Sequence, residues 1–177
     1  MKQEETKRYE SFKREFFHWF LAFSGDEPFS VAAGELLVML KEELALQQAV
    51  LYLFDPSCDA FCPEAAAGRM PAAELIVAEE KQEIVVIDDG GPCIVVRLFF
   101  LLSEETRAML ELMYGKERHI DREWLKVLRT DLSSLFRKLS ALSQRTSEEN
   151  RYEQLHRFAA KIHSTMQIDD VLEEIIR

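Results

Sequence analysis

The sequence predicts an α+β fold, with a central antiparallel sheet flanked by helices and a long helix towards the C-terminal end. Three observations predict this class. Aromatic residues recur at helical spacing near the start, short apolar runs bounded by turn residues fill the middle, and leucines three and four residues apart follow. The 177 residues are 47% hydrophobic and include six Gly and five Pro, which suits one globular domain with long regular elements.

The net charge and the lack of a visible secretory signal limit which partners and which compartment the sequence predicts. The chain has 22 Lys and Arg against 32 Asp and Glu, a formal net charge of −10, which argues against nucleic acid or an anionic membrane as a partner. No secretory signal is visible, and the apolar runs at residues 16–23 and 93–102 are shorter than the roughly 18 residues that cross a bilayer. Because the odd set Cys58, Cys62 and Cys93 suits free thiols, we expect a cytoplasmic protein.

Two amphipathic helices are predicted at the start of the chain. The first covers residues 2–23, where aromatic side chains spaced three and four residues apart form one face. These aromatic residues are Tyr9, Phe12, Phe16, Trp19 and Phe23. Residues 24–28 end this helix, and Ser30 is the expected N-cap of the second. The apolar face of the second helix carries Leu36, Leu37, Leu40 and Leu44.

Five short apolar runs are predicted to be strands. They are residues 49–54, 64–69, 84–87, 93–102 and 107–114. A helix over residues 72–82 precedes the third run, and the Asp-Asp-Gly-Gly-Pro turn of residues 88–92 ends it. The last two runs should pair in antiparallel fashion around residues 103–106. Helix is the competing prediction for residues 104–114, because strong helix formers are frequent there.

A long helix is predicted from residue 121, and since residues 143–151 contain no Gly or Pro it can continue as one helix to residue 167, although the sequence alone does not decide this. Leucines spaced three and four residues apart form a heptad seam in it, as in coiled coils. The seam consists of Leu125, Leu128, Leu132, Leu135, Leu139 and Leu142. At about 1.5 Å per residue such a helix would be roughly 70 Å long, more than a domain of this size can cover. We therefore expect the seam to pair with a second copy in a homodimer. The alternative is that these leucines pack on the chain's own sheet and under its first helix.

The order of these elements and two local patterns resemble GAF domains. The runs C-I-V-V-R-L-F-F, residues 93–100, and R-A-M-L-E-L-M-Y, residues 107–114, are similar to a strand and its returning partner in that family. The stretch Y-E-Q-L-H-R-F-A-A-K-I-H-S-T-M-Q-I-D-D-V-L-E-E-I-I, residues 152–176, looks like the opening of a second GAF domain.

The resemblance implies a domain organisation and a biological context. It implies a GAF-like sensory domain in residues 1–142, a polar helical linker in residues 143–151 and the truncated start of a second domain in residues 152–177. Tandem GAF domains of this kind commonly precede the output domain of a bacterial signalling protein. A GGDEF diguanylate cyclase or a histidine kinase is such an output domain.

The resemblance also suggests pocket residues, although it does not identify a ligand. By position, Tyr52, Arg69 and Asp88 are candidate wall residues. Arg97 interrupts an apolar run of ten residues. On the pocket side it could hold an anionic ligand by a forked hydrogen bond; on the outer side, which we favour, its stem would cover apolar surface while its head reached water. The sequence requires no cofactor, since it lacks the family's cyclic-nucleotide-binding and bilin-attachment motifs.

The Cys, His and Asp residues match no complete metal or catalytic signature. Cys58 and Cys62, expected in a loop, could begin a soft-metal site, but zinc needs about four ligands and no nearby His or Cys pair completes the set. We therefore expect no metal. Asp88 and Asp89 could hold a cation, but a turn explains them equally well. The histidines, expected at the surface or in the seam, are His18, His119, His156 and His163.

The sequence therefore favours a noncatalytic sensory or dimerisation module whose last helix carries a signal to an output domain. Two alternatives stay open. One is a GAF-like free methionine sulfoxide reductase that would use Cys58, Cys62 and Cys93. The other is a structural domain that dimerises without binding a ligand.

Overall fold

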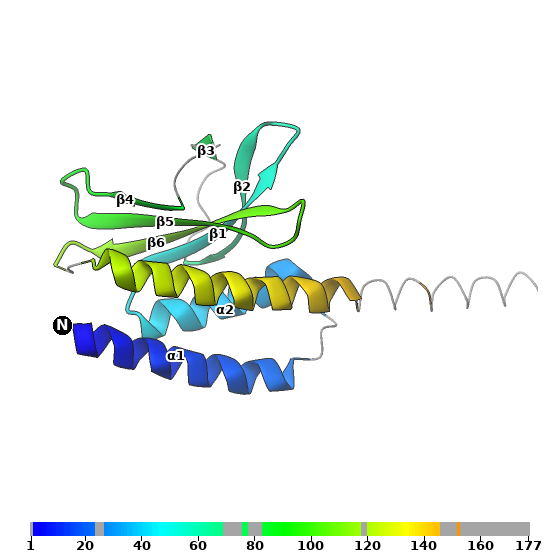
Figure 1. Ribbon diagram of the computed structural model, residues 1–177, viewed down its shortest axis with the longest axis horizontal. Coiled ribbons are helices and arrows are strands. Elements are labelled where there is room, and N and C mark those ends of the chain that lie inside the picture. The colour runs from blue at the N-terminus through cyan, green and yellow to red at the C-terminus, as the bar shows by residue number, and fades with distance from the viewer. Residues whose placement is uncertain are drawn as a thin grey trace, which may run out of the picture.

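The computed structural model describes residues 2–23, 27–68, 76–77, 83–117, 120–145 and 152. Its helices are α1, Lys2–Ala22, α2, Phe29–Glu43, and a C-terminal helix over residues 122–145 (Figure 1). Its strands are β1 Gln48–Asp55, β2 Ala60–Ala67, β3 Ile76–Val77, β4 Ile84–Ile87, β5 Cys93–Leu101 and β6 Arg107–Gly115. The predicted α+β class, with an antiparallel sheet and a long last helix, is confirmed.

The described strands form one antiparallel sheet in the order β3-β2-β1-β6-β5-β4. β4 has the predicted bounds, and β5 and β6 each differ by one residue from the predicted hairpin. The helical alternative for residues 104–114 was wrong, because residues 107–115 pair with β5 along their whole length. Cross-strand packing therefore overrides the helix propensity of this stretch.

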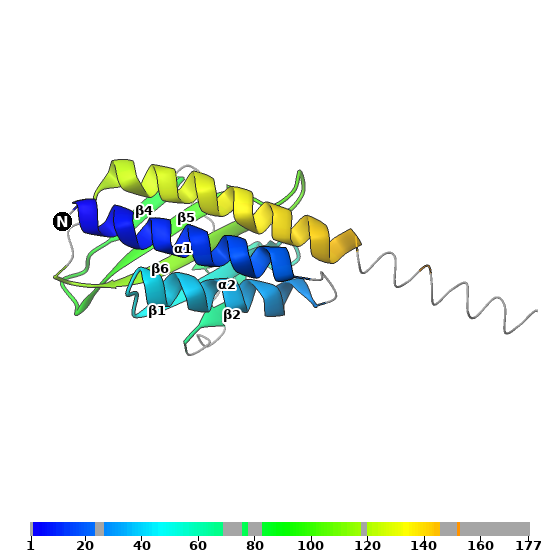
Figure 2. The same ribbon diagram turned by 90° about the horizontal axis from the view of Figure 1, so that it is seen from below.

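The described helices lie on one face of the sheet in two layers. Figure 1 shows α2 and the C-terminal helix directly beneath the sheet, with α1 below both. In Figure 2, seen from below, α1 lies between the other two helices. One buried apolar core joins these layers, with members from α1, α2, the strands and the C-terminal helix. No helix among the described residues combines the length and apolar composition that crossing a bilayer would require.

α1 is held to the domain by its aromatic face. Phe12 has no exposed surface. The buried Tyr9 ring meets Trp124 of the C-terminal helix edge-on, and the Tyr9 hydroxyl donates a hydrogen bond to Asp131 Oδ2 at 3.2 Å. Lys13 Nζ lies 3.1 Å from the same oxygen. Burial, together with the Asp131 carboxylate, raises the pKa of Tyr9, so the phenol stays a neutral donor. The chain therefore covers the predicted aromatic stripe itself.

The buried face of the C-terminal helix follows helical rather than heptad periodicity. Four of the predicted seam leucines have no exposed surface within this chain: Leu125, Leu128, Leu132 and Leu139. Further along, the buried positions shift to Phe136 and Ser143, whereas Leu135 and Leu142 are half-buried. A straight helix has 3.6 residues per turn, so a heptad seam gradually rotates away from a flat core. These contacts favour the alternative for the four leucines, and a homodimer through this helix stays a prediction.

Three local predictions were wrong. Ser30 does not cap α2; Pro28 is the N-cap residue and no side chain bonds to the helix start, because the fixed φ of proline already sets the chain direction. β2 begins at Ala60, so Cys62 lies in a strand and not in a loop. Residues 76–77, expected in a helix, form β3 against β2, because β-branched Ile and Val fit a sheet edge. The rest of the predicted helix at 72–82 lies outside the described residues.

The predicted domain boundaries stay predictions. The helix continues through residues 143–145 of the expected linker, and residue 152 is helical. Residues 146–151 and 153–177, which include His156, His163 and the expected start of a second domain, lie outside the described residues, as does His119. His18 is exposed on α1, as expected of a surface histidine.

Removing the Phe12 ring tests how α1 is held. Phe12→Ala should lower the free energy of unfolding by about 3 kcal/mol, because it leaves a cavity between α1 and the core. Phe17→Ala is the matched control on the same helix; since Phe17 is 58% exposed, its loss should stay below about 0.5 kcal/mol. Urea denaturation followed by circular dichroism measures both. Equal losses would show that α1 does not dock through this face.

Candidate functional site

The sheet face turned away from the helices is here called the distal face. It carries Arg97, the charged residue that interrupts the apolar run of β5. Along β5, Val96 and Leu98 pack in the core on the helix side, so the alternate residues Arg97 and Phe99 lie on the distal face. A second apolar cluster occupies part of this face. Its buried members are Val50, Tyr52, Phe61 and Met109. The distal face is therefore largely apolar around Arg97.

Arg97 forms an ion pair with Glu111 in this apolar face. The two residues lie directly opposite each other on β5 and β6, and Arg97 Nε donates to Glu111 Oε2 at 2.8 Å. Their side chains keep 27% and 14% of their surface exposed. Val85 on β4 and Val50 on β1 are the next partners across the sheet. We expected the Arg97 guanidinium to reach water. Instead it balances the charge of the half-buried Glu111 carboxylate.

Of the other predicted pocket residues, Tyr52 alone is placed on the distal face by the described structure. Tyr52 is opposite Met109 on β6, is 3% exposed and packs in the second apolar cluster. Asp88 lies in the β4–β5 turn and is exposed. Arg69 lies outside the described residues. The predicted set is thus only partly brought together, around β1, β5 and β6.

The Asp88–Asp89 segment is built as a turn. Asp88 Oδ1 accepts the backbone N–H of Gly90 at 3.1 Å, and Asp89 Oδ1 accepts that of Gly91 at 2.9 Å. Gly90 has φ +82°, which a residue with a side chain rarely adopts. The geometry of the turn therefore explains the positions of both carboxylates.

The C-terminal helix is attached to β5 by two arginines. Arg129 Nε donates to Phe99 O at 2.7 Å, and Arg137 Nη2 donates to Leu101 O at 3.2 Å. Arg129 also pairs with Glu83, with Nη2 3.1 Å from Oε1. β4 begins opposite Leu98, and the N–H of Phe99 still bonds Glu83 O, but within the described chain the carbonyls of Phe99 and Leu101 accept from helix arginines where a strand would otherwise bond. The strand that carries Arg97 is therefore also the strand that binds the C-terminal helix.

Two cysteines and one aspartate meet at the tip of the β1–β2 hairpin. Cys58 is exposed, Cys62 is half-buried, and their Sγ atoms are 3.9 Å apart. Asp55 Oδ1 accepts both the Ser57 hydroxyl at 2.7 Å and the Ser57 N–H at 2.8 Å, and these bonds hold the pKa of Asp55 below its ordinary value. Desolvation and the neighbouring Cys58 raise the pKa of the Cys62 thiol.

The third cysteine is far from this pair. Cys93 Sγ donates to Gln47 Oε1 at 2.7 Å, next to the start of β1, whereas Cys58 follows the end of β1. The strand between these points runs from Gln48 to Asp55, roughly 23 Å at about 3.3 Å per residue. Chemistry that uses all three thiols at one site does not fit this arrangement.

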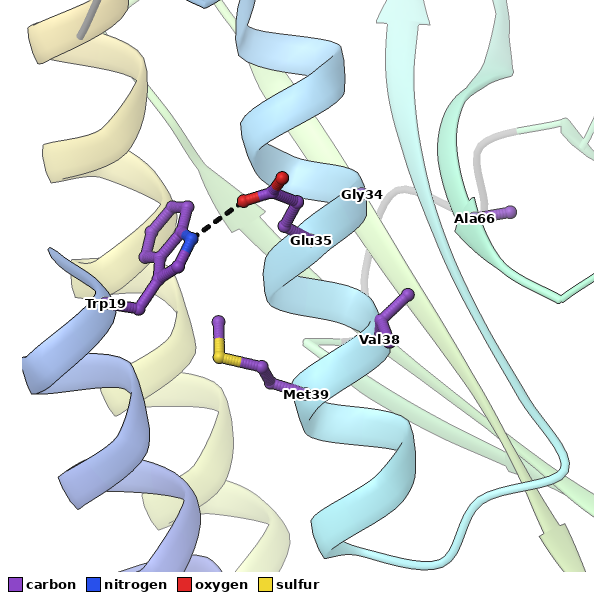
Figure 3. A pocket seen from close by; sticks show the side chains of 6 residues that line it. All are labelled: Trp19, Gly34, Glu35, Val38, Met39 and Ala66. Atoms are coloured by element: carbon purple, nitrogen blue, oxygen red, sulfur yellow. Dashed lines mark hydrogen bonds between the residues drawn. The ribbon is translucent and has the colours of Figure 1, made fainter. Parts of the chain in front are cut away.

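A shallow, mostly apolar groove is lined by residues of α1, α2 and β2 (Figure 3). It encloses about 470 Å³ and is lined by Trp19, Gly34, Glu35, Val38, Met39 and Ala66. Trp19 Nε1 donates to Glu35 Oε2 at 2.7 Å, so the two polar side chains that line the groove already bond to each other. A groove without further convergent polar groups is a weaker ligand site than the distal face.

Three residues of the candidate sites were not predicted from the sequence. Glu111 is identified by its register opposite Arg97, which an alternating strand pattern alone does not fix. Asp55 joins the cysteine pair only through the bend of the hairpin. Arg129 was hidden among surface charges of a helix, and its partner is a backbone carbonyl that no sequence pattern marks.

No protein-family model and no curated protein matches this sequence. Solved structures do match. The phycoerythrobilin-bound GAF domain of a cyanobacterial phytochrome aligns with 78% of this chain and 97% of its own length, at a TM-score of 0.58 and 11% identity. The GAF domain/HD domain protein from Geobacter sulfurreducens aligns with 68% of this chain and 97% of its own length, at 0.53 and 13%.

A third match is the free methionine-R-sulfoxide reductase from Neisseria meningitidis in complex with its substrate. It aligns with 68% of this chain and 83% of its own length, with a TM-score of 0.51 and 18% identity. At these identities the matches establish the fold and not an activity. The chain has the GAF fold, as the sequence resemblance implied.

Breaking the distal ion pair from one side should cost more than removing it whole. Arg97→Met leaves the Glu111 carboxylate uncompensated in an apolar face and should lower the free energy of unfolding by about 2 kcal/mol. Arg97→Met combined with Glu111→Leu should recover most of that loss. Urea denaturation of the single and double variants measures both. A double variant no more stable than the single would show that the stranded carboxylate is not the cause.

Proposed function

We propose that this GAF-fold domain is a noncatalytic, cytoplasmic sensory module of a bacterial signalling protein, that it acts as a homodimer, and that its C-terminal helix relays a signal to a downstream output domain such as a diguanylate cyclase. One observation carries the proposal. β5 holds the Arg97–Glu111 pair on the distal face and binds Arg129 of the C-terminal helix through the carbonyl of Phe99, two residues further on. A structural change at the Arg97–Glu111 pair would therefore act on β5, the strand to which the C-terminal helix is bound.

The distal face is the proposed sensing surface. The bond to Glu111 uses the Nε–H of Arg97, and a guanidinium has five N–H donors. A small anionic molecule can bind the remaining donors, or compete with Glu111 for the same guanidinium. Either event changes the charge balance of a half-buried pair, and it favours whichever arrangement of β5 and the helix binds the ligand better.

The noncatalytic reading is supported by the positions of the cysteines. The reductase alternative would combine Cys58, Cys62 and Cys93, yet Cys93 lies at the opposite end of the sheet from the other two. Burial and Cys58 also raise the pKa of the Cys62 thiol, which lowers its thiolate fraction at neutral pH. The similarity to the Neisseria meningitidis reductase is therefore a similarity of fold.

Dimerisation is supported by apolar surface that the domain leaves uncovered. On α1, Phe17 and Leu21 are 58% and 68% exposed and lie one helical turn apart. On the C-terminal helix, Leu135 and Leu142 are half-buried. These side chains, together with Val127, which is 55% exposed on the C-terminal helix, are among the apolar contacts that the described chain can offer to a second copy, whereas the four fully buried leucines are not.

Native mass spectrometry of freshly purified protein tests sensing and dimerisation together. We expect a dimer that retains a small molecule, and we expect Arg97→Gln to remain dimeric but to lose the added mass. Glu35→Gln, in the groove between α1 and α2, is the control and should keep it. A dimer without added mass would support the ligand-free structural alternative, and a monomer at every concentration would contradict the proposed assembly.

Insertions in the linker test the relay in a protein that carries the output domain. One residue inserted between positions 146 and 147 rotates everything beyond it by about 100° and should change output activity several-fold. Seven inserted residues restore the phase to within about 20° and should largely preserve activity. Melting of the first domain should be unchanged in both. Equal activity of all three proteins would contradict a relay through helix rotation.

A further inference from the structure

The tip of the β1–β2 hairpin places three metal-ligating side chains together. Asp55 ends β1, Cys58 lies in the turn and Cys62 lies in β2. One ligand atom from each, two Sγ atoms and a carboxylate oxygen, lies within 4.8 Å of the others. Within the described residues, no other group of three Cys, His, Asp or Glu side chains converges in this way. The sequence alone offered only the two cysteines.

We propose that Asp55, Cys58 and Cys62 bind a thiophilic divalent cation of the zinc class, with water as the fourth ligand. Zinc is held tetrahedrally with Zn–S bonds of about 2.3 Å, which places two thiolate sulfurs roughly 3.8 Å apart. The observed Sγ–Sγ distance is 3.9 Å. A disulfide needs about 2.05 Å, so the pair is already spaced for a bridging metal and not for a covalent bond. Three protein ligands and one open position are an established zinc arrangement.

The surroundings of the three residues orient them for this role. Ser57 fixes the Asp55 carboxylate with two hydrogen bonds to Oδ1, so Oδ2 is the oxygen that can turn to the metal. Partners of this kind hold ligating carboxylates in position. The turn between the ligands is tight, with Asp59 at φ +52°, and Cys58 Sγ lies 3.7 Å from the Asp55 carbonyl. Cys58 is exposed, which provides a path for the ion.

The proposed site is separate from the distal ion pair and does not depend on the sensory function. The Cys-x-x-x-Cys spacing falls within the range of structural zinc sites, and a bound ion would cross-link the end of β1, the turn and the start of β2 at the hairpin tip. Soft thiolate ligands favour zinc-like ions over magnesium or calcium. The chemistry therefore specifies a thiophilic cation and excludes the hard cations.

Titration of the reduced chain with Co²⁺ and Cd²⁺ tests the proposal. We expect one equivalent of each ion to bind and to produce a sulfur-to-metal charge-transfer band. Cys62→Ser should abolish that band, and Asp55→Asn should weaken binding about tenfold. Ser57→Ala keeps every ligand and the backbone N–H bond to Asp55 but loses the hydroxyl bond, so it should weaken binding less than Asp55→Asn does. Cys93→Ser, at the other end of the sheet, is the matched control and should bind like the unaltered chain.

Several outcomes would overturn the proposal. Binding without a charge-transfer band would mean adventitious carboxylate coordination, and an equal loss of signal in Cys93→Ser would place the metal elsewhere. A purified chain lighter by two hydrogens, with Cys58 and Cys62 resistant to alkylation, would identify a disulfide in place of a metal site. Circular dichroism of each variant separates loss of ligands from loss of fold.

Discussion

The burial of the C-terminal helix against one face of the sheet is the contact on which the other features depend. Its leucines fill the helix-side core, and Phe136 stacks on Phe100 of β5 with ring centroids 5.9 Å apart. Each buried leucine contributes about 1.5–3 kcal/mol. The same helix supplies Trp124 and Asp131, the partners of Tyr9, so it holds α1 together with α2, to which Trp19 of α1 donates a hydrogen bond at Glu35. Without the C-terminal helix, the part of the sheet face that α2 does not cover, and the Tyr9 end of the aromatic face of α1, would be exposed to water.

This use of the helix limits how it can transmit a signal. Leu128 and Leu132 have no exposed surface, so they cannot leave the core to form a seam with another chain without uncovering the sheet. The proposed relay would therefore require movement of the whole helix relative to β5. Such a movement would have to break or exchange the hydrogen bonds of Arg129 and Arg137 to the β5 carbonyls of Phe99 and Leu101.

The sequence was most informative where one physical constraint dominates. α1, β4 and the β5–β6 hairpin follow from periodicity and turn chemistry and were predicted to within one residue at each end. The site was less predictable, because it depends on register. A four-residue loop at 103–106 would have placed Arg97 opposite Leu112; the actual connection of five residues places it opposite Glu111. A shift of one residue moves a side chain to the other face of the sheet, and hydrophobic patterning alone does not specify loop length at that precision.

The hairpin tip and the distal ion pair are linked through Phe99. Its ring packs against Phe61 with centroids 5.7 Å apart, and Phe61 packs against Phe54, which precedes Asp55. Its N–H donates to Glu83 O at 2.9 Å, and its carbonyl accepts from Arg129. One residue of β5 thus touches the β1–β2 hairpin through its side chain and the C-terminal helix through its backbone. Contact alone does not establish coupling. Because Arg97 lies two residues away on the same strand, a variant such as Phe99→Leu would test coupling between the hairpin tip and the Arg97–Glu111 pair while leaving the backbone bond to Arg129 available.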